Sequence, residues 1–189
     1  MRKILLATLA AAAIVGTSAS ANEYADQLTA LANGELAAIA QGPELVAAIT
    51  AQNETTSGYD QAKIDALDTQ WRAEVDASSK PLIDEVLANA ASAYLLGVQE
   101  ASEGLYTEIF AMDAKGLNVG QSTVTSDYWQ GDEGKWQNTF LAGAGAVDIG
   151  DVEQDESTQI FQSQVSIPVL DDAGTPIGAI TFGVNVEYL

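Results

Sequence analysis

The chain has 189 residues, of which 47% are hydrophobic, and a formal net charge of −20 with no histidine and no cysteine. This length suffices for one domain with a sizeable core. The charge argues against binding to nucleic acid or to an anionic membrane, and the missing side chains exclude a thiolate nucleophile, a Ser-His-Asp triad and the usual zinc sites. Such acidity is typical either of a protein from a salty habitat or of a site tuned toward cations.

The first residues have the pattern of a secretory signal peptide. Arg2 and Lys3 form a short basic region, residues 4–15 are apolar, and residues 19–21 have the A-x-A form of a cleavage site. The apolar run is too short to cross a bilayer comfortably, although an uncleaved membrane anchor is the alternative. We therefore predict that residues 1–21 are a cleaved signal peptide and that the product is a soluble periplasmic protein.

Residues 22–79 have the pattern of an N-terminal helical region. Helical spacing continues to a break at residues 42–43, and Pro43 and Glu44 suit the first turn of a new helix. Residues 54–58 predict a loop, after which one helix face is formed by Ile64, Leu67, Trp71 and Val75. The helical stretch before Ser57 is expected to pack either on the rest of its own domain or on a second copy of the chain in a homodimer.

The clearest predicted helix follows residues 78–81. Ser78 and Ser79 precede Lys80 and Pro81, which favours a serine N-cap followed by a proline in the first turn. Apolar residues then recur with helical spacing as far as Ala101. We predict one long helix that lies across a sheet.

The pattern changes at Gly104 from helical spacing to period two. Residues 105–112 and 117–123 are predicted to form antiparallel strands around a turn in which Gly116 can take a positive φ. Alternating apolar residues at 161–169 and 178–186 predict a closing hairpin. Helices followed by about five antiparallel strands define an α+β fold.

Residues 125–140 are the most unusual stretch, because aromatic, acidic and amide side chains crowd together there between predicted strands. Tyr128, Trp129 and Trp136 are predicted to form an aromatic box at the mouth of a small-molecule pocket. Asp127 and Asp132 would supply charge or hydrogen bonds. The alternative is that one or two of the rings only fill the core under a long loop.

Lys135 is the only cation of this stretch. It is expected either to pair with a ligand carboxylate or to bridge Asp132 or Glu133 on the surface. Gln162 and Gln164 share one side of their predicted strand, facing either the pocket floor or solvent. Because bases are so few, a neutral or amine-bearing ligand is favoured over a strongly anionic one. The predicted ligand-binding residues are Asp127, Tyr128, Trp129, Asp132, Lys135, Trp136, Phe161 and Gln164.

An acidic run occupies residues 148–156, with Asp148, Asp151, Glu153, Asp155 and Glu156. Oxygen ligands suit calcium, but the run lacks D-x-D-x-D-G spacing, so a solvated acidic edge is the favoured interpretation. No metal or cofactor site is predicted. Paired carboxylates are the only catalytic chemistry available, as in glycoside hydrolysis, but acids are so plentiful that a pair arises by chance, and no enzymatic activity is predicted.

Several motifs occur in order along the second half of the chain. They are residues 125–133 (Thr-Ser-Asp-Tyr-Trp-Gln-Gly-Asp-Glu), 135–137, 155–159, 162–169 and 177–186. Together they resemble bacterial extracytoplasmic sensor domains of the Cache type, also called PDC domains, over residues 80–189 and more loosely over residues 42–75. The resemblance implies a long helix before a PAS-like five-stranded antiparallel sheet, with a ligand pocket between the sheet and the loops that follow its second strand.

The predicted function is that of an exported, soluble sensory domain. It would capture a neutral or amine-bearing small molecule and present its changed shape to a membrane receptor or kinase. Closure of residues 125–140 over the ligand is the expected event, and the helix that ends near Ser102 is expected to respond through the sheet. The alternatives are a docking or structural protein whose pocket is filled by its own side chains, and a carboxylate-dependent hydrolase.

Overall fold

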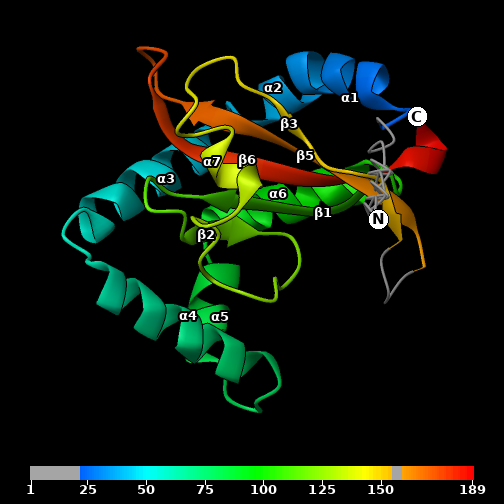
Figure 1. The fold of residues 1–189 in the computed structure, drawn as a ribbon. Coiled ribbons are helices and arrows are strands. Elements are labelled where there is room, and N and C mark those ends of the chain that lie inside the picture. Colours follow the sequence, from blue (N-terminus) through cyan, green and yellow to red (C-terminus); the bar gives the residue numbers. More distant parts are fainter. Residues whose placement is uncertain (1–21, 155–158) are drawn as a thin grey trace, which may run out of the picture.

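The computed structural model describes residues 22–154 and 159–189, shown as a ribbon in Figure 1. The predicted signal peptide at residues 1–21 lies outside the described residues. Within these two ranges, no helix combines the length and the apolar character that a membrane span requires.

One open antiparallel sheet organises the fold. Its strands run in the order β2-β1-β6-β5-β3, and β4 also pairs with β5. The strands are β1 (Tyr106–Met112), β2 (Asn118–Gln121), β3 (Asp148–Ile149), β4 (Glu153–Gln154), β5 (Phe161–Leu170) and β6 (Pro176–Asn185). Gly116, in the turn between β1 and β2, has a φ of +79°, as predicted. The predicted α+β class is confirmed, and the arrangement is consistent with a PAS-like sensor domain.

Most of the helices precede the sheet. They are α1 (Ala25–Leu31), a π-helical turn η1 (Ala32–Leu36), α2 (Ala37–Ile39), α3 (Pro43–Thr56), α4 (Gln61–Val75), α5 (Pro81–Leu87) and α6 (Ala90–Ala101), followed later by α7 (Gly134–Gln137) and the 3-10 turn η2 (Val186–Tyr188). Pro43 starts α3, as predicted. The loop predicted at residues 54–58 is wrong for its first half, because α3 continues to Thr56.

The main core lies between the sheet and the helices α1, α3 and α6. Fully buried side chains of these helices and of η1 pack on one face of β1, β5 and β6, and they include Leu28, Leu36, Leu45, Ile49 and Leu95. Each buried side chain of this size contributes about 1.5 to 3 kcal/mol. The helical stretch before Ser57 therefore packs on the sheet of its own chain.

The predicted long helix is divided into two. Between α5 and α6, Asn89 has an extended backbone with φ −82° and ψ 165°. Its side chain accepts a hydrogen bond from the Ser92 N–H at 2.8 Å and donates one to the Val119 carbonyl of β2 at 2.7 Å. An asparagine that caps the second helix in this way ends the first. The break lets α5 pack against α4, where Ile83 and Val86 join a second core around Trp71.

Glu74, and not the predicted Ser78 or Ser79, satisfies the first turn of α5. Its carboxylate accepts hydrogen bonds from the N–H groups of Leu82 at 2.8 Å and Ile83 at 3.1 Å. Burial favours the neutral acid, but hydrogen bonds from Gln70 and from these two N–H groups outweigh it and lower the pKa of Glu74. A glutamate from the preceding helix thus replaces the expected serine cap.

We expect Glu74→Gln to lower the free energy of unfolding by about 1 to 2 kcal/mol, because a neutral amide accepts hydrogen bonds more weakly than a carboxylate. Since the folded-state pKa is lowered, the carboxylate's contribution is complete above its ordinary value of 4.5 and is lost as the pH falls through the folded value. Urea unfolding at neutral and acid pH measures this, with Glu54→Gln at an exposed position of α3 as the control. An equal difference at both pH values would contradict the prediction.

Candidate ligand-binding site

A polar cleft lies on the face of the sheet opposite the main core. It consists of two cavities of about 280 Å³ and 330 Å³ that share Glu133, Lys135 and Gln164. The first is also lined by Glu108, Phe110, Val124, Thr125, Ser126, Asp127 and Gln130, and the second by Gly150, Asp151, Glu153 and Gln162. Residues 124–135, which we call the roof segment, follow β2 and lead into α7 (Figure 1). The pocket expected between the sheet and the loop after its second strand thus has a counterpart here.

The floor of the cleft depends on Gly183 of β6. This glycine pairs with Glu108 of β1 on one side and with Gln164 of β5 on the other. Across it, Gln164 Nε2 donates to Glu108 Oε1 at 2.9 Å, and the Thr107 hydroxyl donates to Gln162. A Cβ at Gly183 would overlap the Thr107 hydroxyl and would lie 2.8 Å from Glu108 Cγ. The two hydrogen bonds can cross β6 because that position has no side chain.

Lys135 extends from α7 over this floor. Its Nζ lies 2.8 Å from Glu133 Oε2 and 3.3 Å from Gln130 Oε1, and 5.4 Å from the centre of the Phe110 ring. The side chain is only 16% exposed. Of the two bridges predicted for Lys135, the one to Glu133 forms and the one to Asp132 does not, and the pair lies in the cleft rather than on the open surface.

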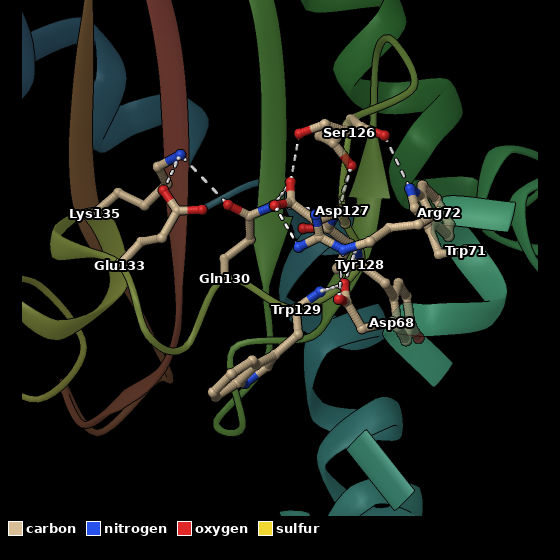
Figure 2. Close-up of polar contacts among 12 residues, drawn as sticks. Asp68, Trp71, Arg72, Ser126, Asp127, Tyr128, Trp129, Gln130, Glu133 and Lys135 are labelled. Carbon is tan, nitrogen blue, oxygen red and sulfur yellow. Dashed lines mark hydrogen bonds and ion pairs between the residues drawn. The ribbon is translucent and has the colours of Figure 1, made fainter. Parts of the chain in front are cut away.

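A continuous series of polar contacts joins Lys135 to α4 (Figure 2). Gln130 accepts from Lys135 and donates to the Asp127 carboxylate at 3.2 Å. Asp127 accepts from Arg72 Nη2 at 3.0 Å, and Arg72 Nε donates to Asp68 at 2.7 Å. The hydrogen bond to Asp68 and the charges of both aspartates raise the pKa of Arg72. Hydrogen bonds and ion pairs therefore link Lys135 through Gln130 and Asp127 to Arg72 of α4.

Asp68 also fixes the roof segment to α4. Its Oδ1 accepts hydrogen bonds from the N–H groups of Tyr128 at 2.9 Å and Trp129 at 3.1 Å. One turn away, the indole N–H of Trp71 donates to the Thr125 carbonyl at 2.9 Å. Side chains of α4 thus hold the backbone of the roof segment on one side, and Gly116 and Asn118 bond to it on the other.

Thr125 joins the roof segment to β2. Its hydroxyl accepts from Asn118 Nδ2 at 2.8 Å and lies 3.2 Å from Gln121 Oε1. Asn118 Oδ1 and Gln121 Nε2 are buried and have no hydrogen-bond partner among the residues of the two described ranges. Buried polar atoms in this condition are uncommon in folded proteins. Hydrogen bonding at this corner of the site is therefore incomplete.

The predicted aromatic box around a single space is wrong. Tyr128 stacks on Trp71 with 5.2 Å between ring centres, and Trp129 packs against the same helix-side core. Trp136 instead stacks on Phe140 at 5.2 Å, in a separate cluster on the cleft face of the sheet. Each indole N–H donates to a backbone carbonyl, as buried tryptophans require. The rings pack in two cores, in line with the alternative that they fill the core under a long loop.

Three of the predicted site residues come together in the cleft: Asp127, Lys135 and Gln164. Asp132 is exposed and is absent from the cleft lining, and Phe161 is 44% exposed at the start of β5. The prediction missed Glu108, Phe110, Gln130 and Glu133 as lining residues. The signal for the first two was available, because the period of two in residues 105–112 places both on one face of the strand.

The cleft is strongly acidic. Its lining carries one ammonium group, that of Lys135, and five carboxylates: Glu108, Asp127, Glu133, Asp151 and Glu153. The ammonium group is already paired with Glu133, and Asp127 is paired with Arg72 at the rim. The remaining carboxylates make a cationic group the favoured guest, since charge-assisted hydrogen bonds are the stronger kind.

The acidic run at residues 148–156 borders this cleft through Asp151 and Glu153. Asp155 and Glu156 lie outside the described residues. Within residues 22–154 and 159–189, no group of three or more acidic side chains is arranged to hold a metal ion. The structure thus offers no geometry for the calcium alternative in the part of the run that it describes.

The solved structures that are similar to this chain include sensor domains. No protein-family model and no curated protein matches it. Among solved structures, it is similar to the sensor domain of the histidine kinase DctB from V. cholerae, with 16% identity, a TM-score of 0.47 and coverage of 86% of this chain and 50% of that one. It is also similar to the ligand-binding domain of the Campylobacter jejuni chemoreceptor Tlp3 in complex with L-valine, with 12% identity, a TM-score of 0.40 and coverage of 87% and 62%.

A third neighbour is the E. coli DcuS sensor domain, with 16% identity, a TM-score of 0.37 and coverage of 66% of this chain and 92% of that one. The chain spans between half and about three fifths of the length of the DctB and Tlp3 structures. All three neighbours are sensor or ligand-binding domains.

Proposed function

We propose that this protein is an exported sensory domain that binds a small amine-bearing or neutral polar molecule in the cleft. The observation that supports this most strongly is the charge of the lining, in which five carboxylates accompany one paired ammonium group. A protonated amine placed over the floor gains hydrogen bonds to Glu108 and to the amide oxygens of the glutamines. A dicarboxylate would face five carboxylates and a single ammonium group, which is already paired with Glu133.

The proposed signal begins at the pair of Lys135 and Glu133. A ligand amine that binds Glu133 competes with Lys135 and changes its contact with Gln130. That contact continues through Asp127 to Arg72 on α4, so the roof segment and α4 respond together. Closure of the roof segment over the ligand is the proposed event, and a membrane receptor or kinase is the proposed partner.

The docking-protein alternative has one observation in its favour, because Tyr128, Trp129 and Trp136 do fill their own spaces. The cleft is separate from these rings, however, and its lining is polar and partly open. A surface built only for docking does not need a row of hydrogen-bonded polar side chains across a sheet floor. We therefore favour the sensory function.

Calorimetric titration with probes of similar size and different charge tests the proposal. The probes are putrescine as a diamine, L-valine as a zwitterion, and succinate as a dianion. We expect the amine-bearing probes to bind and to raise the melting temperature, because binding to the folded state stabilises it by RT ln(1 + [L]/Kd). Succinate is expected to have no effect. Failure of both amines, or tighter binding of succinate, would overturn the proposal.

Glu108→Gln is expected to weaken binding of the amine probe by about tenfold, because it removes a charge from the floor. The substituted amide still presents an oxygen to Gln164, so the floor keeps its shape. Calorimetry with the same probe measures the loss. Glu100→Gln, at an exposed position of α6, makes the same change of charge away from the cleft and should leave the affinity unchanged. Equal affinities of the two variants would contradict the role of Glu108.

A further inference from the structure

A second cavity lies among α3, α4 and α5, on the side of the roof segment away from the cleft. Its volume is about 400 Å³, within the ~300 to 1,000 Å³ range of small-molecule sites. It is lined by Ala51, Gln52, Thr55, Thr56, Tyr59, Leu67, Leu82, Glu85, Val86, Asn89, Val119 and Tyr128. In Figure 1, α4 and α5 project beyond β2, which contributes Val119 to the wall. This second cavity shares no lining residue with either cavity of the cleft.

Tyr128 is one of the residues that line this second cavity. The residue is 6% exposed, and its ring is fixed by stacking on Trp71. Among the described residues, no hydrogen bond involves its hydroxyl, and the hydroxyl is not one of the fully buried unpaired atoms, so a guest can reach it. Burial raises the pKa of Tyr128, so the hydroxyl stays protonated and can both donate and accept. A guest in the cavity can therefore donate a hydrogen bond to this hydroxyl or accept one from it.

The floor of the second cavity offers acceptors. Thr56 donates its hydroxyl hydrogen to the buried Asp113 carboxylate at 2.8 Å, and Gln52 Nε2 donates to the same oxygen at 3.1 Å. Both side chains are therefore oriented with their donors turned away, which leaves Gln52 Oε1 and the Thr56 oxygen lone pairs for a guest. Asp113 is held in turn by the N–H groups of Lys115 and Leu117, so the floor is rigid.

The side chains that form the walls of the second cavity indicate which other groups a guest should carry. Leu67, Leu82, Val86 and Val119 supply apolar surface, and Tyr59 adds an aromatic ring. The only charged side chain of the lining is the carboxylate of Glu85. A guest that matches these surfaces has a hydrogen-bond donor with positive charge at one end and a compact apolar or aromatic body at the other.

We infer that this cavity is a second binding site, which takes a small primary amine with an apolar or aromatic body. The ammonium group points to Gln52, Thr56 and Glu85, and the body lies against the leucine and valine walls beside Tyr128. The site is independent of the cleft, because its lining is different. The roof segment separates the two, with Asp127 facing the cleft and Tyr128 facing the second site.

Titration of the 15N-labelled protein with phenethylamine tests this inference, and phenylacetate is the probe of opposite charge. We expect phenethylamine to shift the Trp71 indole N–H signal and the amide signals of Val86 and Val119, and to do so equally in the Glu108→Gln variant, in which binding in the cleft is weakened. Phenylacetate should shift none of them. Absence of shifts at Trp71, Val86 and Val119, or their loss in the Glu108→Gln variant, would overturn the second site.

A matched pair of threonine substitutions on α3 gives the decisive comparison. Thr55 lines the cavity and Thr50 does not, yet both are exposed and both donate to the carbonyl four residues earlier. Thr55→Trp directs an indole back along the helix into the cavity and should weaken phenethylamine binding by about tenfold or more. Thr50→Trp should leave it unchanged, as should Glu108→Gln, which separates this result from the test of the cleft. Equal binding by both threonine variants would refute the inference.

Discussion

Gly183→Ala is expected to abolish ligand binding in the cleft and to lower the free energy of unfolding by about 1 to 3 kcal/mol, the usual cost of overpacking. The added methyl group occupies the space through which Glu108 and Gln164 reach each other across β6. It also overlaps the hydroxyl of Thr107, whose short side chain has little freedom to move away. The two hydrogen bonds of the floor must therefore break or rearrange.

The loss of both properties separates this substitution from a general effect of removing glycine. Calorimetry with the best amine probe measures the affinity, and urea unfolding measures the stability. Gly97→Ala is the matched control, because Gly97 is exposed in α6 and has no atom within 4 Å of an added Cβ. It should raise the free energy of unfolding by about 0.5 to 1 kcal/mol. Unchanged affinity of the Gly183→Ala variant would show that the floor is not part of the binding site.

Asp68→Ala is expected to release the roof segment from α4 and to cost about 2 to 4 kcal/mol of unfolding free energy. The aspartate accepts two backbone N–H groups of the roof segment and one guanidinium N–H of Arg72. Removal leaves the N–H groups of Tyr128 and Trp129 without their acceptor. Hydrogen exchange should show these two amides losing protection, and the affinity for the amine probe should fall with them.

A graded series distinguishes the anchor from the charge. Asp68→Asn retains an oxygen for the two N–H groups and loses only the ion pair with Arg72, so most of the protection should return. Asp65→Ala, on the same helix, removes an exposed carboxylate that contacts Gln61 and should change stability by about 0.5 kcal/mol or less. Full protection of both amides in Asp68→Ala would contradict the anchoring role.

Much of the fold follows from the spacing of apolar residues. The face formed by Ile64 and Trp71 is the buried side of α4, and Phe182 and Val184 alternate along β6 as expected. The α4 pattern is strong because that helix buries one face, whereas β6 is buried on both faces and keeps its large apolar residues on one of them. The turn at Gly116 was predictable for a local reason, since a positive φ favours glycine.

The division between α5 and α6 was not predictable from spacing alone. Asn89 stands in an apolar pattern that continues on both sides of it, and its effect depends on the Val119 carbonyl thirty positions later in the chain. The cap of α5 was hidden for the same reason, because Glu74 reaches it from the previous helix. Contacts between elements, and not local preferences, decide these helix ends.

The candidate site was predicted in its location and not in its composition. Residues 125–140 do cover the sheet, and Asp127, Lys135 and Gln164 do meet there. The direction of the rings was beyond the sequence, because Tyr128 and Asp127 are neighbours whose side chains face different cavities. The local backbone conformation decides which of two adjacent side chains faces a site. That conformation cannot be predicted from composition.

The incomplete hydrogen bonding at β2 has a mechanical consequence. Among the described residues, this strand pairs with β1 alone, and Asn118 Oδ1 and Gln121 Nε2 have no hydrogen-bond partner, so these two atoms can form new hydrogen bonds when the strand moves. The Gln121 N–H donates to the Ser92 hydroxyl, and Asn89 donates to the Val119 carbonyl, so both links end on the first turn of α6. Any sideways movement of β2 must therefore pull on the first turn of α6.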